Sequence, residues 1–282
     1  PWRFAAALRA AGLNAPQLLP PRAKVVPASR WLRKPLRSAG GLGIVEGGEP
    51  HGRSYVQEYI EGRSCSAVFL AMAGGTLLCG ITRQLHGPAW HAGPFGYAGS
   101  LGPLTNEEAG IGPERADPLK AIGDLLAGEF GLRGLVGVDF LVNERGVWPV
   151  EVNPRYTASV EILERSRGGG LLGLHRSACV GGEVVEPPFV HEPRSERLEG
   201  KAIVYARSAL IVPETLPAWL TARDALGRPA AADLPQAGVR IEPGQPVLTV
   251  FAAGEDCAAL EASLAALVDR AWDELDKMQA AT

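Results

Sequence analysis

The sequence predicts an α+β fold with a small N-terminal part, a mixed central domain and a β-rich C-terminal appendage. Three observations lead to this prediction. Few segments have helical periodicity, most of the others are short runs that alternate apolar and polar residues, and glycine-containing turns join several of these runs in pairs. We place the three parts at residues 1–64, 65–190 and 191–282.

The composition narrows the class of protein. The chain has 282 residues, of which 46% are hydrophobic and 21% charged, and a net charge of -3. No run is rich in lysine or arginine, so we expect no nucleic-acid partner, and no apolar run reaches the roughly 20 residues that a membrane helix needs. The four cysteines are far apart and form no CxxC pair, which predicts reduced thiols and a cytoplasmic location. Whether the protein forms a homo-oligomer stays open.

The first residues, PWRFAAALRAAGLNAP, predict an amphipathic helix that ends between Gly12 and Pro16. The chain starts inside this helix and without a methionine. We therefore expect the sequence to be a fragment that lacks its true beginning.

Short apolar runs predict the strands of the first half of the chain, at residues 31–35, 55–60, 67–71 and 76–83. Ala73-Gly74-Gly75 predicts a hairpin turn between the last two. Residues 86–104 are rich in glycine and proline, so we expect an irregular loop there.

The second half of the chain combines helices with further short strands. Helical periodicity is expected at 119–130 and 157–167, and an amphipathic helix closes the chain at 256–278. Residues 187–200 resemble a linker. The appendage is expected to hold strands at 201–206, 239–242 and 247–252.

A second hairpin, GVDFLVNERGVWPVEVN, is expected between Gly137 and Asn153. A three-residue turn that ends at Gly146 would pair Asn143 with Val147, Leu141 with Pro149 and Asp139 with Glu151. One face would then be apolar and carry Val138, Phe140, Val142, Trp148, Val150 and Val152.

The opposite face of this hairpin would carry Asp139, Glu151 and Asn153. Like charges directly opposed on a sheet are destabilising, so the two carboxylates need a shared proton or a cation. Three oxygen donors without His or Cys suit Mg²⁺ or Mn²⁺. Taken alone, a solvated sheet face without a ligand is an equally good interpretation. Arg155 follows with the same parity and could bind an anion beside the metal.

A glycine-rich loop follows Lys34 and contains Ser38, Gly40, Gly41 and Gly43. Glycines let backbone N–H groups approach an anion closely, and a lysine at the end of the preceding strand adds a charge for phosphate. The spacing fits neither a Walker A motif nor a dinucleotide fingerprint. By itself, a plain flexible turn is the favoured interpretation.

The strand QEYIEG supplies a third polar group. Its backbone could pair with an adenine edge, and Glu58 or Glu61 could accept from the amine or from a ribose hydroxyl. An amphipathic strand with solvated glutamates is again favoured when the segment is taken alone.

The order of these parts resembles the ATP-grasp superfamily of carboxylate–amine or carboxylate–thiol ligases. The resemblance covers residues 1–165 and is most distinctive in GVDFLV and PVEVNPRYTASVEI. It implies a lid and a central domain that grip ATP between them. The pattern is also similar to ATP-grasp proteins linked to methanopterin-type one-carbon metabolism.

The resemblance implies a role for each matching position. Lys34 and the loop would contact the ATP phosphates, Asp139, Glu151 and Asn153 would hold Mg²⁺, and Arg155 would steady the transferred phosphate. The other residues implied to bind ATP are Ser38, Gly40, Gly41, Gly43, Gln57, Glu58, Ile60, Glu61 and Arg83.

The implied reaction joins a small-molecule carboxylate to an amine through an acyl phosphate, with ADP and phosphate as products. Two alternatives stay within the resemblance: a carboxylase-type subunit, and a nucleotide-binding module without catalysis. A third belongs to another class, because two carboxylates about 5 Å apart also suit a retaining glycosidase. That alternative leaves the glycine loop and QEYIEG without a role.

Overall fold

The computed structural model describes residues 1–20, 30–48, 52–112, 117–181 and 197–280. Most of the predicted linker at 187–200 lies outside these ranges. The chain divides into two compact units, one of Pro1–Arg83 with Pro103–Arg194 and one of Gln84–Gly102 with Ser195–Thr282. Residues 84–102, which we had placed in the central domain, thus belong to the second unit. Helices and antiparallel sheets confirm the α+β class.

The first unit begins with helix α1 (Trp2–Ala10), as its periodicity predicts. A four-stranded antiparallel sheet follows, which we call the lid sheet, with the strand order β1-β4-β2-β3. Its strands are β1 (Leu18–Leu19), β2 (Trp31–Pro35), β3 (Val45–Glu46) and β4 (Ser54–Glu58). The Trp2 ring lies edge-on against Tyr55 of β4, with ring centroids 5.7 Å apart, so α1 is anchored on this sheet.

The rest of the first unit is built on a second antiparallel sheet, the central sheet, with the strand order β6-β5-β8-β9. Its strands are β5 (Arg63–Met72), β6 (Gly75–His86), β8 (Gly134–Asn143) and β9 (Gly146–Asn153). The helices of this part are α2 (Asn106–Ala109), α3 (Pro118–Gly128), α4 (Ala158–Arg167) and α5 (Leu171–Cys179).

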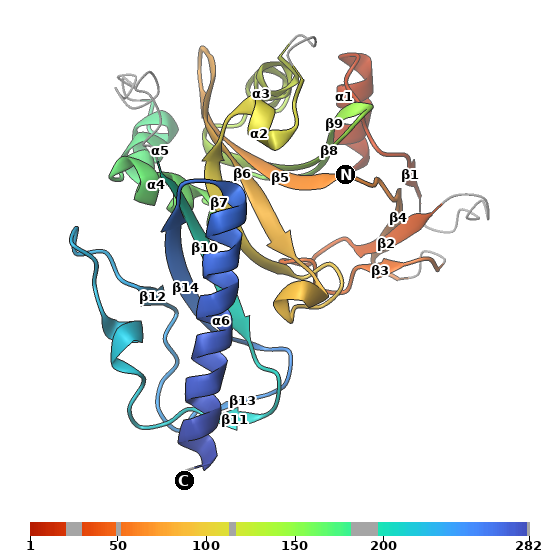
Figure 1. Cartoon of the computed structure of the whole chain (residues 1–282). Helices are drawn as coiled ribbons and strands as arrows, with labels where there is room; N and C mark the ends of the chain where they lie inside the picture. The colour runs from red at the N-terminus through yellow and green to blue at the C-terminus, as the bar shows by residue number, and fades with distance from the viewer. Residues whose placement is uncertain (21–29, 49–51, 113–116, 182–196, 281–282) are drawn as a thin grey trace. The chain divides into compact units, whose positions relative to one another are not determined.

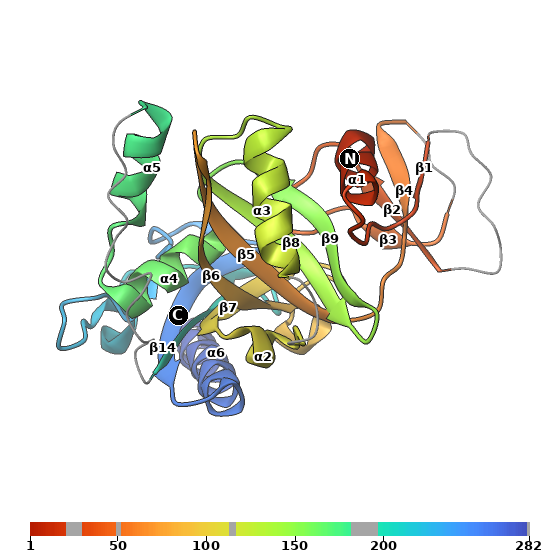
Figure 2. The ribbon, with the colours of Figure 1, turned by 90° about the horizontal axis from the view of Figure 1, so that it is seen from above.

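Helices cover both faces of the central sheet. Figure 2 shows α3 lying across β5 and β8. On the opposite face, Val160 and Leu163 of α4 pack with Val68, Leu70 and Leu135 in a buried apolar cluster. This burial fixes α4, and the polar segment between β9 and α4 is held at one end of the sheet as a result.

The hairpin of β8 and β9 confirms one predicted pair and corrects the turn. Asp139 pairs with Glu151, as expected, but Asn143 pairs with Gly146 and Phe140 with Pro149. The turn therefore contains two residues instead of three. A β-bulge at Val150, between the Phe140 and Asp139 pairs, restores the predicted register toward the end of the strand.

The corrected turn changes which side chains share a face. Val147 and Pro149 now lie with Phe140 and Val142, whereas Trp148 pairs with Leu141 on the side of Asp139. The Trp148 indole donates to Asn143 Oδ1 at 3.2 Å, so it uses its polar atom although the residue is 9% exposed. The prediction that Trp148 and Val150 belong to a wholly apolar face is wrong, because it contained no bulge.

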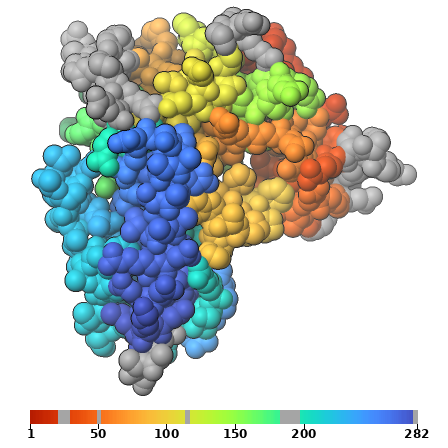
Figure 3. Space-filling model, in the orientation of Figure 1, coloured from red at the N-terminus to blue at the C-terminus, as the bar shows by residue number. Residues whose placement is uncertain are grey.

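The second unit contains a sheet with the strand order β12-β14-β10-β7. Its strands are β7 (Tyr97–Leu104), β10 (Leu198–Tyr205), β12 (Ala231–Ala232) and β14 (Pro246–Gly254). Helix α6 (Cys257–Ala280) packs on β10 and β14, and its outward side is exposed in Figure 3. Trp272 of α6 is fully buried and its indole donates to Tyr205 O at 3.0 Å.

Short elements complete this unit. They are η1 (Pro88–Trp90), η3 (Ala218–Thr221) and a two-stranded ladder of β11 (Leu210–Ile211) and β13 (Arg240–Ile241). Among the described residues, no helix combines the length and the apolar composition that a membrane span requires.

Strand β7 corrects the prediction of an irregular loop over 86–104. Its residues YAGSLGPL are almost all buried, and four of them pair with β10. A Cβ on Gly99 would lie 2.1 Å from Lys201 O, so glycine is needed where the two backbones approach closely. Small residues obscure this strand in the sequence pattern, and at Gly99 the packing requires one of them.

Two glycines of helix α3 test how closely this helix packs on the central sheet. A Cβ on Gly123 would lie 2.4 Å from Thr76 Oγ1 and 3.0 Å from Phe69 Cδ1, whereas one on Gly128 of the same helix would meet nothing within 4 Å. Gly128→Ala should raise the free energy of unfolding by about 0.4–1 kcal/mol. Gly123→Ala should lower it by about 1–3 kcal/mol, because overpacking outweighs the helix preference. Urea unfolding of the two variants measures both, and shifts of the same sign would contradict this packing.

Candidate functional site

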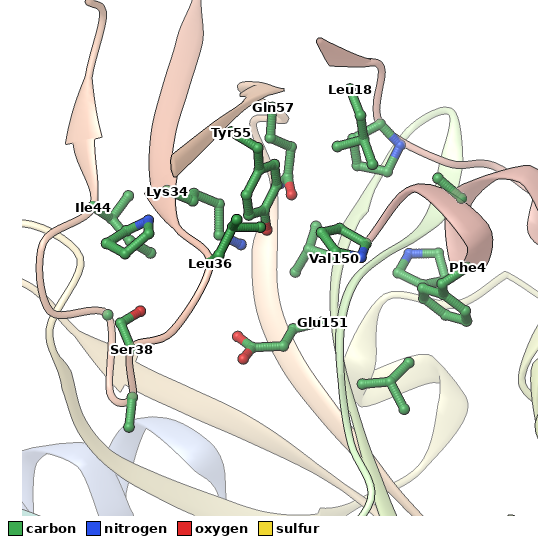
Figure 4. Close-up of a pocket in the computed structure, with 18 of the residues that line it drawn as sticks. Phe4, Leu18, Lys34, Leu36, Ser38, Ile44, Tyr55, Gln57, Val150 and Glu151 are labelled. Carbon is green, nitrogen blue, oxygen red and sulfur yellow. The ribbon is translucent and has the colours of Figure 1, made fainter. Parts of the chain in front are cut away.

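A cavity of about 280 Å³ lies in the first unit. It is lined by the lid sheet, by helix α1, by the glycine-rich loop and by residues Pro149–Val152 of β9. Figure 4 shows Lys34 and Tyr55 projecting into it from the lid sheet and Glu151 from β9. Two predicted polar residues, Lys34 and Glu151, therefore share one space with Tyr55.

Lys34 is the buried charge of this cavity. Strand β2 carries it, Tyr55 of β4 is its cross-strand partner, and the residue is only 8% exposed. Burial lowers the pKa of its ammonium group, and the charges of Glu151 and Asp139 oppose this shift. In the described part of the chain its ammonium group has no hydrogen-bond or ion-pair partner. It is available to an anion inside the cavity.

Tyr55 is a site residue that the sequence did not reveal. Burial raises the pKa of its hydroxyl to about 12, and the nearby charge of Glu151 adds to this shift. Its position two residues before Gln57 on β4 places both side chains on the same face. That spacing could have identified it.

The predicted strand QEYIEG is divided by the structure. Gln57 is 4% exposed and lines the cavity. Glu58 instead joins β1 to β4, since its Oε2 accepts from Gln17 N at 3.0 Å and its own N–H donates to Gln17 O at 2.8 Å. Ile60 is buried, and the backbone oxygen of Glu61 accepts from Asn143 Nδ2 at 2.7 Å. None of the last three lines the cavity.

The glycine-rich loop lies at the cavity as expected, with Ser38, Gly40 and Gly41 among its lining residues. Gly40 has a φ of 62° and Gly41 a φ of 78°, a left-handed region that other residues enter only with strain. Two consecutive residues of this kind turn the backbone sharply beside Lys34. Gly43 does not line the cavity, and a Cβ there would approach Pro35 Cγ to 3.0 Å.

The predicted metal ligands form one connected polar group. Asn153 Nδ2 donates to Asp139 Oδ2 at 3.1 Å, and Arg155 Nη2 donates to Asn153 Oδ1 at 3.1 Å. Glu151 is exposed and lies opposite Asp139 across the hairpin. The structure thus brings all four residues together at the end of β8 and β9.

This donor set fits a hard divalent cation. Two carboxylates and an amide oxygen are ligands that Mg²⁺ accepts, and a cation would neutralise the two opposed charges. Within the described ranges, no three residues of the types His, Cys, Asp and Glu group into a metal site. A cation here would therefore need the Asn153 oxygen, and water or ligand oxygens, to complete its coordination.

Arg83 lies away from this group. It pairs with Cys65 of β5, and Cys65 pairs with Phe140 of β8. Because alternate residues of a strand project to opposite faces, Arg83 faces away from Asp139.

Apolar side chains make up much of the remaining lining, and the sequence pattern does not indicate that most of them line a cavity. They are Phe4, Leu8, Leu18, Ile44, Val150 and Val152. They come from four separate segments of the first unit, and only the folding of α1 and the lid sheet brings them together. An apolar cavity with a few polar groups is the usual form of a small-molecule site.

Comparison with known proteins assigns the family. A model of the ATP-grasp domain matches residues 1–159. An uncharacterized protein of Methanocaldococcus jannaschii is 28% identical over 196 residues, which are 70% of this chain and 41% of that protein. The carbamoyl phosphate synthase large chain of Myxococcus xanthus is 24% identical over 132 residues, 47% of this chain and 12% of the synthase. The chain thus spans less than half the length of these relatives.

Solved structures share the fold. An L-amino acid ligase from Bacillus licheniformis superimposes with a TM-score of 0.69 at 15% identity, over 95% of this chain and 70% of the ligase. The biotin carboxylase domain of a Hydrogenobacter thermophilus 2-oxoglutarate carboxylase, in complex with magnesium ADP and bicarbonate, gives 0.65 at 14% identity, over 96% of this chain and 64% of that one. Because the family model covers more than half of the sequence, the chain belongs to the ATP-grasp domain family.

Proposed function

We propose that the protein is a magnesium-dependent ligase that uses ATP to join a small-molecule carboxylate to an amine through an acyl phosphate. The observation that carries the proposal is the buried, unpartnered ammonium group of Lys34, which faces a cavity shared with Glu151 and the glycine-rich loop. The similar ligase and the similar magnesium ADP complex support both the reaction class and the nucleotide.

The cavity would hold the base of the nucleotide at its apolar end. Leu18, Val150 and Val152 offer apolar surface, and Tyr55 adds an aromatic ring. The amide of Gln57 provides both a donor and an acceptor, so it could read the polar edge of a base. Glu61 stays a candidate for a ribose hydroxyl, although it lies outside the lining.

The phosphates would lie between Lys34 and the glycine-rich loop. A buried positive charge acts on phosphate oxygens more strongly than an exposed one, because less water screens it. The left-handed glycines orient backbone N–H groups that can receive further phosphate oxygens. Arg155, exposed at the end of the hairpin, would steady the phosphoryl group as it moves to the carboxylate.

Asp139, Glu151 and Asn153 would hold the magnesium ion. When bound, the ion would supply positive charge that offsets the negative charge developing on the phosphate during transfer. The two carboxylates would keep the ion in place, and Asn153 links Asp139 to Arg155.

The same residues weigh against a glycosidase. A glycosidase would need one protonated and one ionised carboxyl group, with space for a sugar between them. Here the charges of Glu151 and Asp139 both act on the Lys34 ammonium group, and Asn153 donates to Asp139 Oδ2. The cavity also extends toward the lid sheet and α1.

A carboxylase-type reaction is the second candidate, and the similarity to the biotin carboxylase domain favours it. It would begin with the same phosphoryl transfer but use bicarbonate in place of an organic carboxylate. An ADP-release assay over bicarbonate, amino acids and methanopterin-type carboxylates, each with and without an amine, separates the two. Binding of ATP without ADP release under all of these conditions would identify a nucleotide-binding module.

Glu151→Ala should reduce substrate-dependent ADP release by about 100-fold or more, because the cation loses a charged ligand at the transferred phosphate. The fold should be retained, since Glu151 is exposed. Glu107→Ala, which removes an exposed glutamate of α2, is the matched control and should stay within twofold of the parent. Parent-like ADP release by Glu151→Ala would refute the proposed function.

Lys34→Met should abolish nucleotide binding and at the same time raise the free energy of unfolding at pH 7. The residue keeps most of its volume but no longer buries a charge, and burial is the main cause of its lowered pKa. Calorimetric titration with ATP and urea unfolding measure the two effects. Lys120→Met is the control, because an exposed i,i+4 pair with Asp124 raises the pKa of Lys120 and its loss should destabilise slightly.

The stability gain of Lys34→Met should also depend on pH. Above the folded-state pKa of Lys34 and below its ordinary value of 10.5, the unfolded parent binds more protons than the folded parent. The parent therefore becomes more stable relative to the variant as the pH rises through this window. A gain that does not change between pH 7 and pH 10 would show that burial of the charge is not its cause.

A further inference from the structure

A row of polar residues crosses the central sheet and ends at the proposed metal ligands. Thr82 of β6 pairs with Ser66 of β5, Ser66 with Asp139 of β8, and Asp139 with Glu151 of β9. Directly paired residues project to the same face, with Cβ atoms about 4.5–5.5 Å apart. The hydroxyl groups of Thr82 and Ser66 therefore continue the same row as the carboxylates, and Ser66 is the direct neighbour of Asp139.

Ser66 is the unexplained member of the row. The residue is 1% exposed, and its Oγ has no hydrogen-bond partner. A buried polar atom without a partner lowers the stability of the folded state, and alanine would remove that penalty without changing the backbone. A serine at this position is therefore expected to have a partner in another state of the protein.

The neighbours of Ser66 indicate which partner that is. The Thr82 hydroxyl donates to Ser159 Oγ at 2.9 Å, so it is already engaged. On the other side, Asp139 Oδ2 accepts from Asn153 Nδ2. A rotation about χ1 of Ser66 would bring its Oγ toward the Asp139 carboxylate, across the distance that separates paired side chains.

Thr157 shows that unused hydroxyl groups are concentrated near these residues. It is the N-cap of α4, yet its side chain makes no capping hydrogen bond, and its buried Oγ1 has no partner. A Cβ on Gly137 would lie 2.5 Å from Thr157 Cγ2, and Gly137 pairs with Asn153. Two unpartnered hydroxyls thus lie beside two of the proposed ligands.

We propose that Ser66 is a positioning residue for the divalent cation, whose hydroxyl donates to the Asp139 carboxylate when that carboxylate binds the ion. This inference rests on the proposed function. A ligating carboxylate needs a fixed orientation, and a hydrogen bond from behind supplies it. Asn153 holds Asp139 when the ion is absent, and Ser66 would hold it when the Asn153 oxygen also turns to the ion.

The test combines ion binding with stability. Mn²⁺ is titrated into the full chain with ADP present, and the free ion is followed by electron paramagnetic resonance. Ser66→Ala should raise the Kd for Mn²⁺ about tenfold, within the range known for groups that support metal ligands. Its free energy of unfolding without Mn²⁺ should be unchanged or higher, since an unpartnered buried hydroxyl is removed.

Thr82→Val is the matched control. It removes the next hydroxyl of the same buried row with little change in volume, and it leaves Ser159 without its partner. It should therefore lower the free energy of unfolding and leave the Kd for Mn²⁺ within twofold of the parent. Ser66→Thr, which keeps the hydroxyl, should bind Mn²⁺ more tightly than Ser66→Ala.

Three outcomes are decisive. A Kd for Ser66→Ala within twofold of the parent would overturn the inference and leave the proposed function intact. A loss of stability in Ser66→Ala as large as that of Thr82→Val would assign the hydroxyl to the fold alone, and would also overturn it. Absence of Mn²⁺ binding by the parent would overturn the proposed function itself, and the inference with it.

Discussion

The opposition of Asp139 and Glu151 across one hairpin is the constraint on which the site depends. Two like charges in that position repel, so the pair requires a compensating cation. The protein supplies one from another segment, because Lys34 of the lid sheet lies within the field of both carboxylates. Lys34 is in turn held by its pairing with Tyr55, and Tyr55 by the ring of Trp2. The position of α1 is thereby coupled to the charge balance of the hairpin.

The same arrangement explains why the lysine is buried at all. An ammonium group loses much of its hydration when it is only 8% exposed, and the lowered pKa of Lys34 reflects that loss. A lysine on an exposed strand would keep the hydration of its ammonium group. Stability is therefore reduced at the position where a charged ligand would restore it, as is common for sites that bind anions tightly.

Much of the site could be predicted from the sequence, because its polar residues follow strict strand alternation. Asp139, Glu151 and Asn153 were expected on one face, and the structure connects them there. The family resemblance, which the comparison confirms, placed Lys34 beside the glycine-rich loop. What could not be predicted depends on the third dimension. Whether Glu58 faces the cavity or bonds to Gln17 is decided by where β1 returns.

The missed parts of the fold share one physical reason. Small residues such as Ala98, Gly99 and Ser100 interrupt the alternation of apolar and polar residues in strand β7, and a Cβ on Gly99 would meet the backbone of β10. The bulge at Val150 inserts one residue, and a residue count in the turn cannot reveal it. Both errors concern local backbone geometry, which hydrophobic patterns do not record.

The bulge also affects how readily strand β9 could pair with another molecule of the same protein. Strand β9 is the outermost strand of the central sheet within the first unit, and a straight open edge invites another chain to add to it. Pro149 removes one backbone donor from that edge and Val150 distorts the next position. The segment that presents Glu151 is thereby also a poor template for aggregation. One local irregularity thus stands beside the carboxylate that lines the cavity and also makes this edge less able to pair with another chain.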